Sequence, residues 1–436
     1  MQMSFTDFIL QHENDDPVRL LLSRDRYPDI DMDLAATTLE VRKKLKTKVP
    51  EWYAVPSLIY PSRLSGEQCS SSETARYKVK VCGSSILPEP SLRDPSHKWA
   101  PPSYAAEGGH RFGEYTAPAN KRLRIADLTG GMGVDSWAFA SVAGEVLYNE
   151  MQEGLAEATE LNFRELGVEN VRFSCKKVEV GKVGEVLDGF EPDVIFLDPA
   201  RRAEDGRKVF LIEECQPDVL GLLPELFAAS RYVLLKLSPM ADISMACKRL
   251  GVHVREVHVV AAGGECKELL FLLDREWEGA GSMFVVEDGA VMEIPGQARN
   301  DVHYGIPQAG DVLFEPGKAL AKAGAFELPC RYGLTKLGQH THLYVGETVL
   351  EELRPFGKVF GIEEVLPLSN RTVKEAGKRW PQAEVTARNV PMTSDLLRKK
   401  LGCASGGDIH LFGVRVDAAS EAGNYLIVTK KRYGTD

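Results

Sequence analysis

The sequence has no paired cysteines and no long apolar run. Its 8 cysteines are scattered and none forms a C-x-x-C pair, so it offers neither a zinc knuckle nor a disulfide framework. No apolar run approaches the roughly 20 residues that span a bilayer. The N-terminal segment also lacks the basic and apolar regions of a signal peptide. We therefore expect a cytoplasmic protein with reduced thiols and no membrane partner.

The sequence also lacks a strong excess of positive charge. Its net charge is −10, although the two ends of the chain differ. Residues 311–436 hold 18 Lys and Arg against 15 Asp and Glu, and residues 368–436 hold 12 against 7. A modestly basic C-terminal region on an acidic body is compatible with RNA contact, and equally with a solvated surface.

The pattern of apolar residues divides the chain into several parts. Residues 1–81 carry apolar positions at helical spacing, as in DLAATTLEVRKKLKTKVPEWY, and predict an N-terminal helical region. Residues 82–121 are rich in Pro, Gly and Ser and predict a surface loop or an insertion. Residues 122–276 alternate strands with helices. After residue 277, short strands and turns predict a mixed region of helices and strands, with a hairpin around Asp288-Gly289.

The strands expected between residues 123 and 273 are nearly continuous apolar runs: RIADL, EVLYNE, VRFSC, PDVIFLDP and RYVLLKLSP. Strands buried on both faces have this composition, which predicts a mostly parallel sheet with helices on both sides. The last two strands, VHVREVHVV and KELLFLL, are separated only by AAGGEC, so they form an antiparallel hairpin. Such an α/β, Rossmann-like sheet ending in a hairpin resembles the class I methyltransferases that use S-adenosylmethionine.

The loop after the first of these strands lacks the nicotinamide-binding fingerprint. G-x-G-x-x-G is absent, and DLTGGMG stands in its place. This order resembles the acidic-x-Gly-x-Gly-x-Gly motif of methyltransferases, and its predicted cofactor-binding residues are Asp127, Thr129, Gly130, Gly131 and Gly133. Glu150 ends the next strand and can accept hydrogen bonds from both hydroxyls of a ribose. The alternatives are a structural glycine turn and a Glu that only stabilises a helix start.

The fourth strand ends in LDPARR and lacks the aromatic residue of amine-directed methyltransferases. In those enzymes Asp or Asn precedes Pro-Pro-aromatic, whereas here Asp198 and Pro199 precede Ala-Arg. Asp198 and Pro199 lie where doubly wound sheets bind ligands, so we expect them to border the cofactor. Arg201 and Arg202 are suited to RNA phosphates or, alternatively, to surface ion pairs.

The fifth strand ends in VLLKLSPM and lacks the nucleophilic Cys of uridine-C5 methyltransferases, because Ser238 stands at that position. Lys236 lies near the end of this apolar strand, where an unpaired ammonium is costly, and Asp198 is a candidate partner. If the last strand inserts antiparallel beside this one, Glu268 joins them. The alternative is that Lys236 and Glu268 reach water at the strand ends.

These three residues resemble part of the Lys-Asp-Lys-Glu set of ribose 2′-O-methyltransferases, in which a Lys deprotonates the acceptor hydroxyl. The other Lys of that set lies on a helix before the first strand, and Lys78 in ETARYKV matches it. The resemblance implies that Lys78, Asp198, Lys236 and Glu268 are catalytic and that a lysine of lowered pKa is the base. An amine held by Asp198 and the Pro199 carbonyl is the alternative acceptor.

The chain as a whole resembles a bacterial family of class I methyltransferases with a C-terminal THUMP-like domain. The resemblance covers most of the chain and rests on QCSSSETARYK, DLTGGMGVDS, LDPARR, GRKVFLIEECQPDVL, LLKLSPMADI, GECKELLFLL, EPGKALAKAGAF, THLY and ARNVPM…LRKKLG…GGD. It implies S-adenosylmethionine as cofactor, a ferredoxin-like segment at 277–313 and a THUMP-like, RNA-binding domain at 314–436. The implied contacts with tRNA or rRNA are Arg388, Arg398, Lys399 and Lys400.

Two other classes of function stay open. The chain could be an RNA-binding protein that has lost catalysis on a methyltransferase fold. It could also be a nicotinamide or nucleotide enzyme, although the absent G-x-G-x-x-G counts against this. His340 and His342 would share one face of a strand, but two ligands without a third do not make a metal site, and we expect no metal.

Overall fold

The computed structural model describes residues 3–86, 123–201, 211–295 and 304–431. These residues divide into two compact units. The first comprises Met1–Val257 and Glu268–Gly281, and the second comprises His258–Lys267 and Ser282–Asp436. Within the described ranges, no helix is both long enough and apolar enough to cross a membrane.

Six α-helices fill residues 3–86, as the helical spacing of the apolar positions predicts: α1 (Phe5–Gln11), α2 (Pro17–Leu22), α3 (Met32–Lys48), α4 (Pro50–Tyr53), α5 (Arg63–Gln68) and α6 (Ser72–Ile86). Asp31 caps α3 by accepting hydrogen bonds from the backbone N–H groups of Asp33 and Leu34. α6 continues past the predicted boundary at 81 because buried Cys82 prolongs its apolar face. The rest of the predicted loop, from residue 87, lies outside the described residues.

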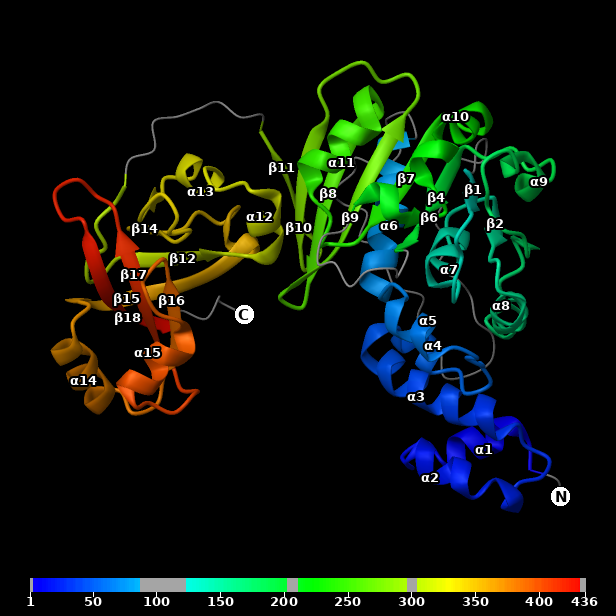
Figure 1. Cartoon of the computed structure of the whole chain (residues 1–436), viewed down its shortest axis with the longest axis horizontal. Coiled ribbons are helices and arrows are strands. Elements are labelled where there is room, and N and C mark those ends of the chain that lie inside the picture. The colour runs from blue at the N-terminus through cyan, green and yellow to red at the C-terminus, as the bar shows by residue number, and fades with distance from the viewer. Residues whose placement is uncertain (1–2, 87–122, 202–210, 296–303, 432–436) are drawn as a thin grey trace. The chain divides into compact units, whose positions relative to one another are not determined.

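Seven strands of one sheet have the order β8-β9-β7-β4-β1-β2-β3 (Figure 1). They are β1 (Arg124–Asp127), β2 (Glu145–Asn149), β3 (Val171–Ser174), β4 (Val194–Leu197), β7 (Tyr232–Leu237), β8 (Val254–Ala262) and β9 (Glu265–Asp274). The pairs β1-β2, β1-β4, β2-β3 and β4-β7 are parallel, whereas β9 runs antiparallel beside β7 with Leu269 opposite Leu237. The expected parallel sheet with an inserted final strand is confirmed.

Helices connect these strands, as crossovers between parallel strands require. They are α7 (Val134–Ala140), α8 (Glu153–Glu165), α9 (Val183–Leu187), α10 (Val219–Ala229) and α11 (Ile243–Leu250). A two-stranded ribbon, β5 (Ala200–Arg201) with β6 (Cys215–Gln216), follows β4. Between β8 and β9, Gly263 and Gly264 both have positive φ (60° and 76°), which a two-residue hairpin turn requires.

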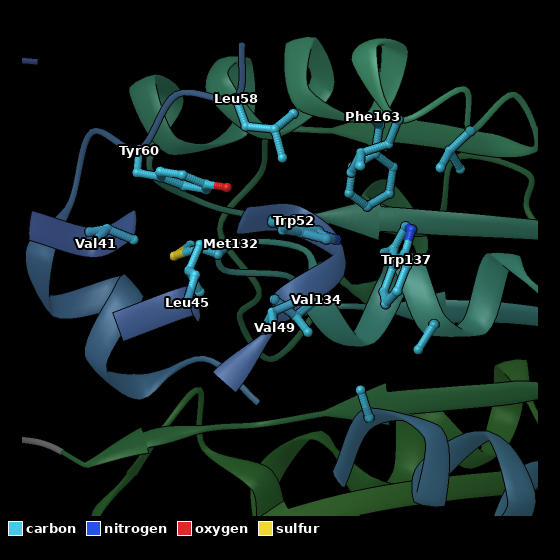
Figure 2. Close-up of a cluster of buried hydrophobic side chains, with 14 of the residues drawn as sticks. Val41, Leu45, Val49, Trp52, Leu58, Tyr60, Met132, Val134, Trp137 and Phe163 are labelled. Atoms are coloured by element: carbon cyan, nitrogen blue, oxygen red, sulfur yellow. The ribbon is translucent and has the colours of Figure 1, made fainter. Parts of the chain in front are cut away.

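A buried aromatic cluster joins the N-terminal helices to the glycine-rich loop (Figure 2). Trp52 of α4 lies edge-on to Trp137 of α7 and to Phe163 of α8, with ring centroids 6.1 and 6.3 Å apart. Met132, from the loop itself, is 4% exposed and belongs to the same cluster. The N-terminal helical region therefore packs directly against the glycine-rich loop that follows it in the sequence.

A hairpin of β10 (Ser282–Glu287) and β11 (Ala290–Ile294) continues this sheet beyond β8. Its turn residues, Asp288 and Gly289, have φ values of 46° and 83°, so the predicted hairpin at this pair is confirmed.

A seven-stranded sheet follows, with the order β13-β14-β12-β15-β18-β17-β16. Its strands are β12 (Val312–Pro316), β13 (Thr335–Lys336), β14 (Tyr344–Gly346), β15 (Gly357–Pro367), β16 (Glu384–Arg388), β17 (Ile409–Val416) and β18 (Gly423–Lys431); the helices are α12 (Lys318–Ala323), α13 (Leu328–Arg331), α14 (Asn370–Arg379) and α15 (Ser394–Leu401). Neighbouring residues Leu411 and Phe412 face opposite sides, as the period of a strand requires. Leu411 packs in the core with α14 and α15, and Phe412 packs in a second core with Leu313. The expected α+β architecture is confirmed.

Candidate active site

The chain turns away from β1 at Asp127, whose carboxylate is 1% exposed. One carboxylate oxygen accepts a hydrogen bond from the Thr129 backbone N–H at 3.1 Å and the other accepts one from the Ser136 hydroxyl at 2.6 Å. Burial raises the pKa of Asp127 to about 7, against the effect of the Ser136 hydrogen bond and with a contribution from nearby Asp135. Asp127 therefore connects the start of the loop, at Thr129, to the helix that follows it, at Ser136.

Glycine is favoured at the three loop positions for different physical reasons. A Cβ on Gly130 would lie 2.2 Å from the Tyr148 ring, and one on Gly133 would lie 2.6 Å from Thr159, so both permit close packing. Gly131 has a φ of 55°, and the nearest atom to a Cβ there is the Thr129 carbonyl oxygen at 4.0 Å, so no neighbour crowds this position. Of the three, Gly131 therefore fits best the prediction that a ligand approaches the backbone.

Glu150 directly follows β2 and is 8% exposed. Its two carboxylate oxygens accept hydrogen bonds from the backbone N–H groups of Gly131 (3.1 Å) and Gln152 (2.9 Å). The structure thus brings together the acid and the glycine that were predicted to hold one cofactor. Its burial argues against the alternative of an exposed Glu at a helix start.

Asp198 follows β4 and is tied to the glycine loop. Its backbone N–H donates to Thr129 Oγ1 at 2.7 Å, so the Thr that replaces the first glycine of the motif links the ends of β1 and β4. The Asp198 side chain is 35% exposed and pairs with Lys236. Pro199 follows at the sheet edge, Arg201 ends β5, and Arg202 lies outside the described residues.

Lys78 lies at the centre of a buried ion network. Its side chain is fully buried on α6, and Nζ lies 2.8 Å from Glu268 Oε1 and 3.1 Å from Asp135 Oδ1. Nζ also donates to the Ser70 hydroxyl at 3.0 Å, which in turn donates to Asp135 at 2.7 Å. The network therefore connects the N-terminal helices to α7 and to the start of β9.

Lys236 forms a separate pair with Asp198, to which it donates a hydrogen bond, and lies near enough to Glu268 and Asp135 to interact with them electrostatically. Burial alone would lower the pKa of Lys236, but the carboxylates of Asp198, Glu268 and Asp135 together raise it above its ordinary value. The expectation of a lowered lysine pKa is therefore wrong for Lys236, because neighbouring carboxylates stabilise its charged form. The four predicted residues form two ion pairs, Lys78 with Glu268 and Lys236 with Asp198, and the two pairs interact electrostatically.

The pKa values of the two other buried carboxylates, Glu268 and Asp135, shift in opposite directions. Burial raises the pKa of Glu268, and Lys78 and Lys236 offset this only in part. Burial would also raise the pKa of Asp135, but the same two lysines outweigh it and lower that pKa. Asp135 is thus the better stabilised anion of the pair.

A pocket of about 240 Å³ lies beside these groups. It runs from Glu150 and Gly131 to the side of the charged cluster, where Asp135, Asp198 and Ser70 line it. Ser65, Gln68 and Cys69 add a wall from the N-terminal helical region. The residues fit a nucleoside with a charged or polar extension, since the pocket has a hydroxyl acceptor at one end and ionic groups at the other.

Sequence reasoning missed Asp135 and Ser70. Asp135 reads as an ordinary acid in the first turn of a helix, and Ser70 reads as a helix-capping residue. The motif GVDSW places Asp135 two residues after Gly133, and that proximity to the loop was the available signal. Its burial against α6 depends on a contact between segments far apart in the sequence.

The predicted RNA contacts of the second unit lie at its surface. Arg388 pairs with Glu315 at 2.8 Å, and Arg398 lies 3.6 Å from Asp395 and 3.8 Å from Glu384. Lys399 and Lys400, at the end of α15, are exposed. The two lysines are therefore more available to a phosphate than the two arginines.

His340 and His342 differ in environment. His340 is exposed, whereas His342 stacks on Phe326 with ring centroids 3.7 Å apart. In the ranges that the structure describes, no group of three or more His, Cys, Asp or Glu side chains is placed to hold a metal ion.

Two domain families match the second half of the chain. A ferredoxin-like domain matches residues 313–353 and a THUMP domain-like family matches residues 357–431. The ferredoxin-like match shares only residue 313 with the predicted segment 277–313.

The whole chain is similar to the crystal structure of a "putative methyltransferase" from Porphyromonas gingivalis W83. The match has 29% sequence identity and a TM-score of 0.75 and covers 99% of this chain and 98% of the other. An rRNA methylase from Streptococcus thermophilus matches 35% of this chain and 88% of its own at 13% identity, with a TM-score of 0.26. A Streptococcus mutans protein solved in complex with SAH matches 35% and 89% at 11% identity, with a TM-score of 0.25. A search of curated protein sequences gave no match.

The fold and the Porphyromonas match agree on the first half of the chain, and the two domain families account for much of the second. The predicted resemblance is confirmed: this chain combines a class I methyltransferase fold with C-terminal ferredoxin-like and THUMP-like domains.

Proposed function

We propose that this protein transfers a methyl group from S-adenosylmethionine to RNA. The observation that carries the proposal is the pocket at the carboxyl ends of β1, β2 and β4, where Gly131, Glu150 and Asp198 meet. Doubly wound sheets bind their ligands at this edge. The full-length similarity to a protein described as a methyltransferase points to the same chemistry.

The cofactor's nucleoside would be held by Gly131 and Glu150. Each Glu150 oxygen already accepts one backbone N–H, and a carboxylate oxygen has a second acceptor position for a ribose hydroxyl. The uncrowded position of Gly131 allows close approach to the backbone. S-adenosylmethionine, when bound, supplies an activated methyl group on a positively charged sulfur.

The acceptor group would contact Asp198. Asp198 lines the pocket and is partly exposed, whereas the lysine behind it is buried and held charged. Asp198 is therefore better placed than Lys236 to accept the hydrogen bond, and finally the proton, of the attacking group. Lys236 then positions the Asp198 carboxylate and stabilises its charge.

Two acceptor atoms remain candidates. The Lys78-Asp198-Lys236-Glu268 cluster favours a ribose hydroxyl, in keeping with the resemblance to ribose methyltransferases. The raised pKa of Lys236 favours an exocyclic amine, because an amine needs a hydrogen-bond acceptor but no strong base before it attacks.

In this proposal the C-terminal THUMP-like domain presents the RNA. The exposed Lys399 and Lys400 would contact phosphates, with Arg388 and Arg398 as additional contacts that must first leave their acidic partners.

The test is transfer of labelled methyl from S-adenosylmethionine to total RNA by the full chain, followed by nucleoside mass spectrometry. We expect one labelled nucleoside, whose modified atom distinguishes the ribose from the amine. Gly131→Val should abolish transfer, because valine is strained at this φ and fills the pocket. Gly154→Val on α8 is the matched control, because no described atom outside the helix's own backbone lies within 4 Å of a new Cβ there.

Binding measurements separate the other functional classes. RNA binding without S-adenosylmethionine binding would identify an inactive RNA-binding protein. Binding of NAD without S-adenosylmethionine would instead identify a nicotinamide enzyme.

A further inference from the structure

The buried cluster beside the pocket holds more acids than bases. Two ammonium groups, those of Lys78 and Lys236, face three carboxylates, those of Asp135, Asp198 and Glu268. With every group ionised, the cluster lacks one positive charge.

This imbalance is costly where the groups are buried. Lys78 is fully buried, and the side chains of Glu268 and Asp135 are 3% and 10% exposed, so water does little to stabilise the excess charge. The carboxyl group of Asp127 is also buried close to Asp135 and Asp198, but with a pKa raised to about 7 it carries only part of a negative charge near neutral pH. The neutral Ser70 hydroxyl bridges Lys78 to Asp135 without changing the balance.

The acidic side of the cluster is the side that meets the pocket. Asp135 and Asp198 line it together with Gly131. The lysines that pair with these carboxylates, Lys78 and Lys236, do not line the pocket. Lys176 and Lys177 also line it, but both are exposed to water, and Lys177 pairs with Glu179. The central atoms of a ligand bound at the glycine loop would therefore lie near the carboxylates of Asp135 and Asp198.

We propose that this acid-rich cluster selects the positively charged sulfur of S-adenosylmethionine over the neutral sulfur of S-adenosylhomocysteine. The inference rests on the proposed function. The two molecules differ by one methyl group and one charge, so a difference in affinity reports mainly on the charge at the sulfur. Bound S-adenosylmethionine supplies the positive charge that the cluster lacks. S-adenosylhomocysteine, formed when the methyl group is transferred, has no charge on its sulfur and should therefore bind more weakly and dissociate more readily.

Calorimetric titration of the full chain with each ligand tests the proposal. We expect S-adenosylmethionine to bind at least about tenfold tighter, because the attraction between one added unit charge and a carboxylate a few ångströms away, at an effective dielectric constant near 20, is larger than a tenfold change in affinity requires. Asp135→Asn leaves two ammonium groups against two carboxylates and should bring the ratio of the two affinities close to one. Glu276→Gln removes an exposed carboxylate that pairs with Arg231 before the start of β7, at the opposite edge of the sheet, and should leave the ratio unchanged.

A third ligand tests the wild-type chain independently of any variant. An analogue of S-adenosylhomocysteine with an ammonium group in place of the sulfur should bind like S-adenosylmethionine. Equal or tighter binding of S-adenosylhomocysteine by the wild type would overturn the inference, as would an unchanged ratio in folded Asp135→Asn. If Asp135→Asn does not fold, weak binding of the ammonium analogue overturns it instead. Failure of all three ligands to bind would overturn the proposed function.

Discussion

Basic residues occupy two regions of this molecule under opposite conditions. In the first unit, Lys78 is fully buried and Lys236 is 12% exposed, and each touches carboxylates. In the second unit, Arg388 is 48% exposed, and Lys399 and Lys400 reach solvent. Lysine and arginine residues count equally toward the net charge, but their contributions to stability and to binding depend on whether they are buried.

The energetic consequence follows from the surroundings. Removing one member of a buried ion network leaves its partners uncompensated and costs about 3–5 kcal/mol. Removing an exposed charge or surface pair costs about 0–1 kcal/mol. Substitutions in the first region should therefore damage folding or chemistry, whereas those in the second should change only affinity for a charged partner.

The largest effect is expected from Lys236→Met, which keeps the length of the side chain and removes its charge. Asp198 loses the cation that positions it, so methyl transfer should fall by about 10²–10⁴-fold, while S-adenosylmethionine still binds. Labelled methyl transfer to RNA measures the first quantity and calorimetry the second. Lys248→Met, an exposed lysine on α11, is the control.

Full activity in Lys236→Met would remove the cluster from the mechanism. A wild-type product methylated on a base nitrogen would discard the ribose acceptor and leave the amine.

Lys78→Met compared with Lys399→Met tests the contrast in stability directly. Loss of Lys78 leaves Glu268 and Asp135 buried without their shared cation and should lower the free energy of unfolding by about 3–5 kcal/mol. Loss of Lys399 should change it by less than about 0.5 kcal/mol. Urea unfolding of the full chain, followed by circular dichroism, measures both. Equal changes would mean that the cluster is open to water in solution.

Asp127→Asn should be more stable than the wild type, by an amount that grows as the pH rises. The folded-state pKa of Asp127 is raised from 3.8 to about 7, so between pH 4 and pH 7 the unfolded chain loses its proton first. Rising pH therefore destabilises the wild type across this window, and the penalty is complete above pH 7. The Asn variant lacks this penalty and should exceed the wild type by about 2–4 kcal/mol at pH 8.

The measurement is urea unfolding of both proteins at pH 5 and pH 8. The difference between them should be small at the lower pH and grow at the higher one. A constant difference would show that Asp127 titrates normally. Asp188→Asn, at an exposed aspartate, is the control.

The sequence predicted well those features that depend on neighbours in the chain. Continuous apolar runs located β1, β2, β4 and β7, and the short connection AAGGEC and the pair Asp288-Gly289 located two hairpins. Lys236 was paired with Asp198 because a charge on an apolar strand needs a partner, and the structure contains that pair.

Features that depend on distant contacts were missed or misjudged. Asp135 is buried by α6, about 60 residues earlier in the chain, and no local period reveals this. For the same reason the pKa of Lys236 could not be given the right direction. That direction follows from three carboxylates on three different elements, of which the sequence analysis had brought only two together.

The smallest effect is expected from the double variant Lys399→Ala/Lys400→Ala. Each exposed lysine that contacts a phosphate releases about 0.7 counterions from single-stranded RNA, so losing both should reduce the slope of log affinity against log salt by about 1.4. Filter binding of the full chain to RNA at several salt concentrations measures this slope, and Lys248→Ala on α11 is the control. The urea midpoint should stay within error of the wild type, because neither lysine has a buried partner among the residues that the structure describes. An unchanged slope would mean that these lysines are merely solvated. A changed slope accompanied by a large loss of stability would mean that the second region resembles the first, and the contrast between buried and exposed charge would fail at that point.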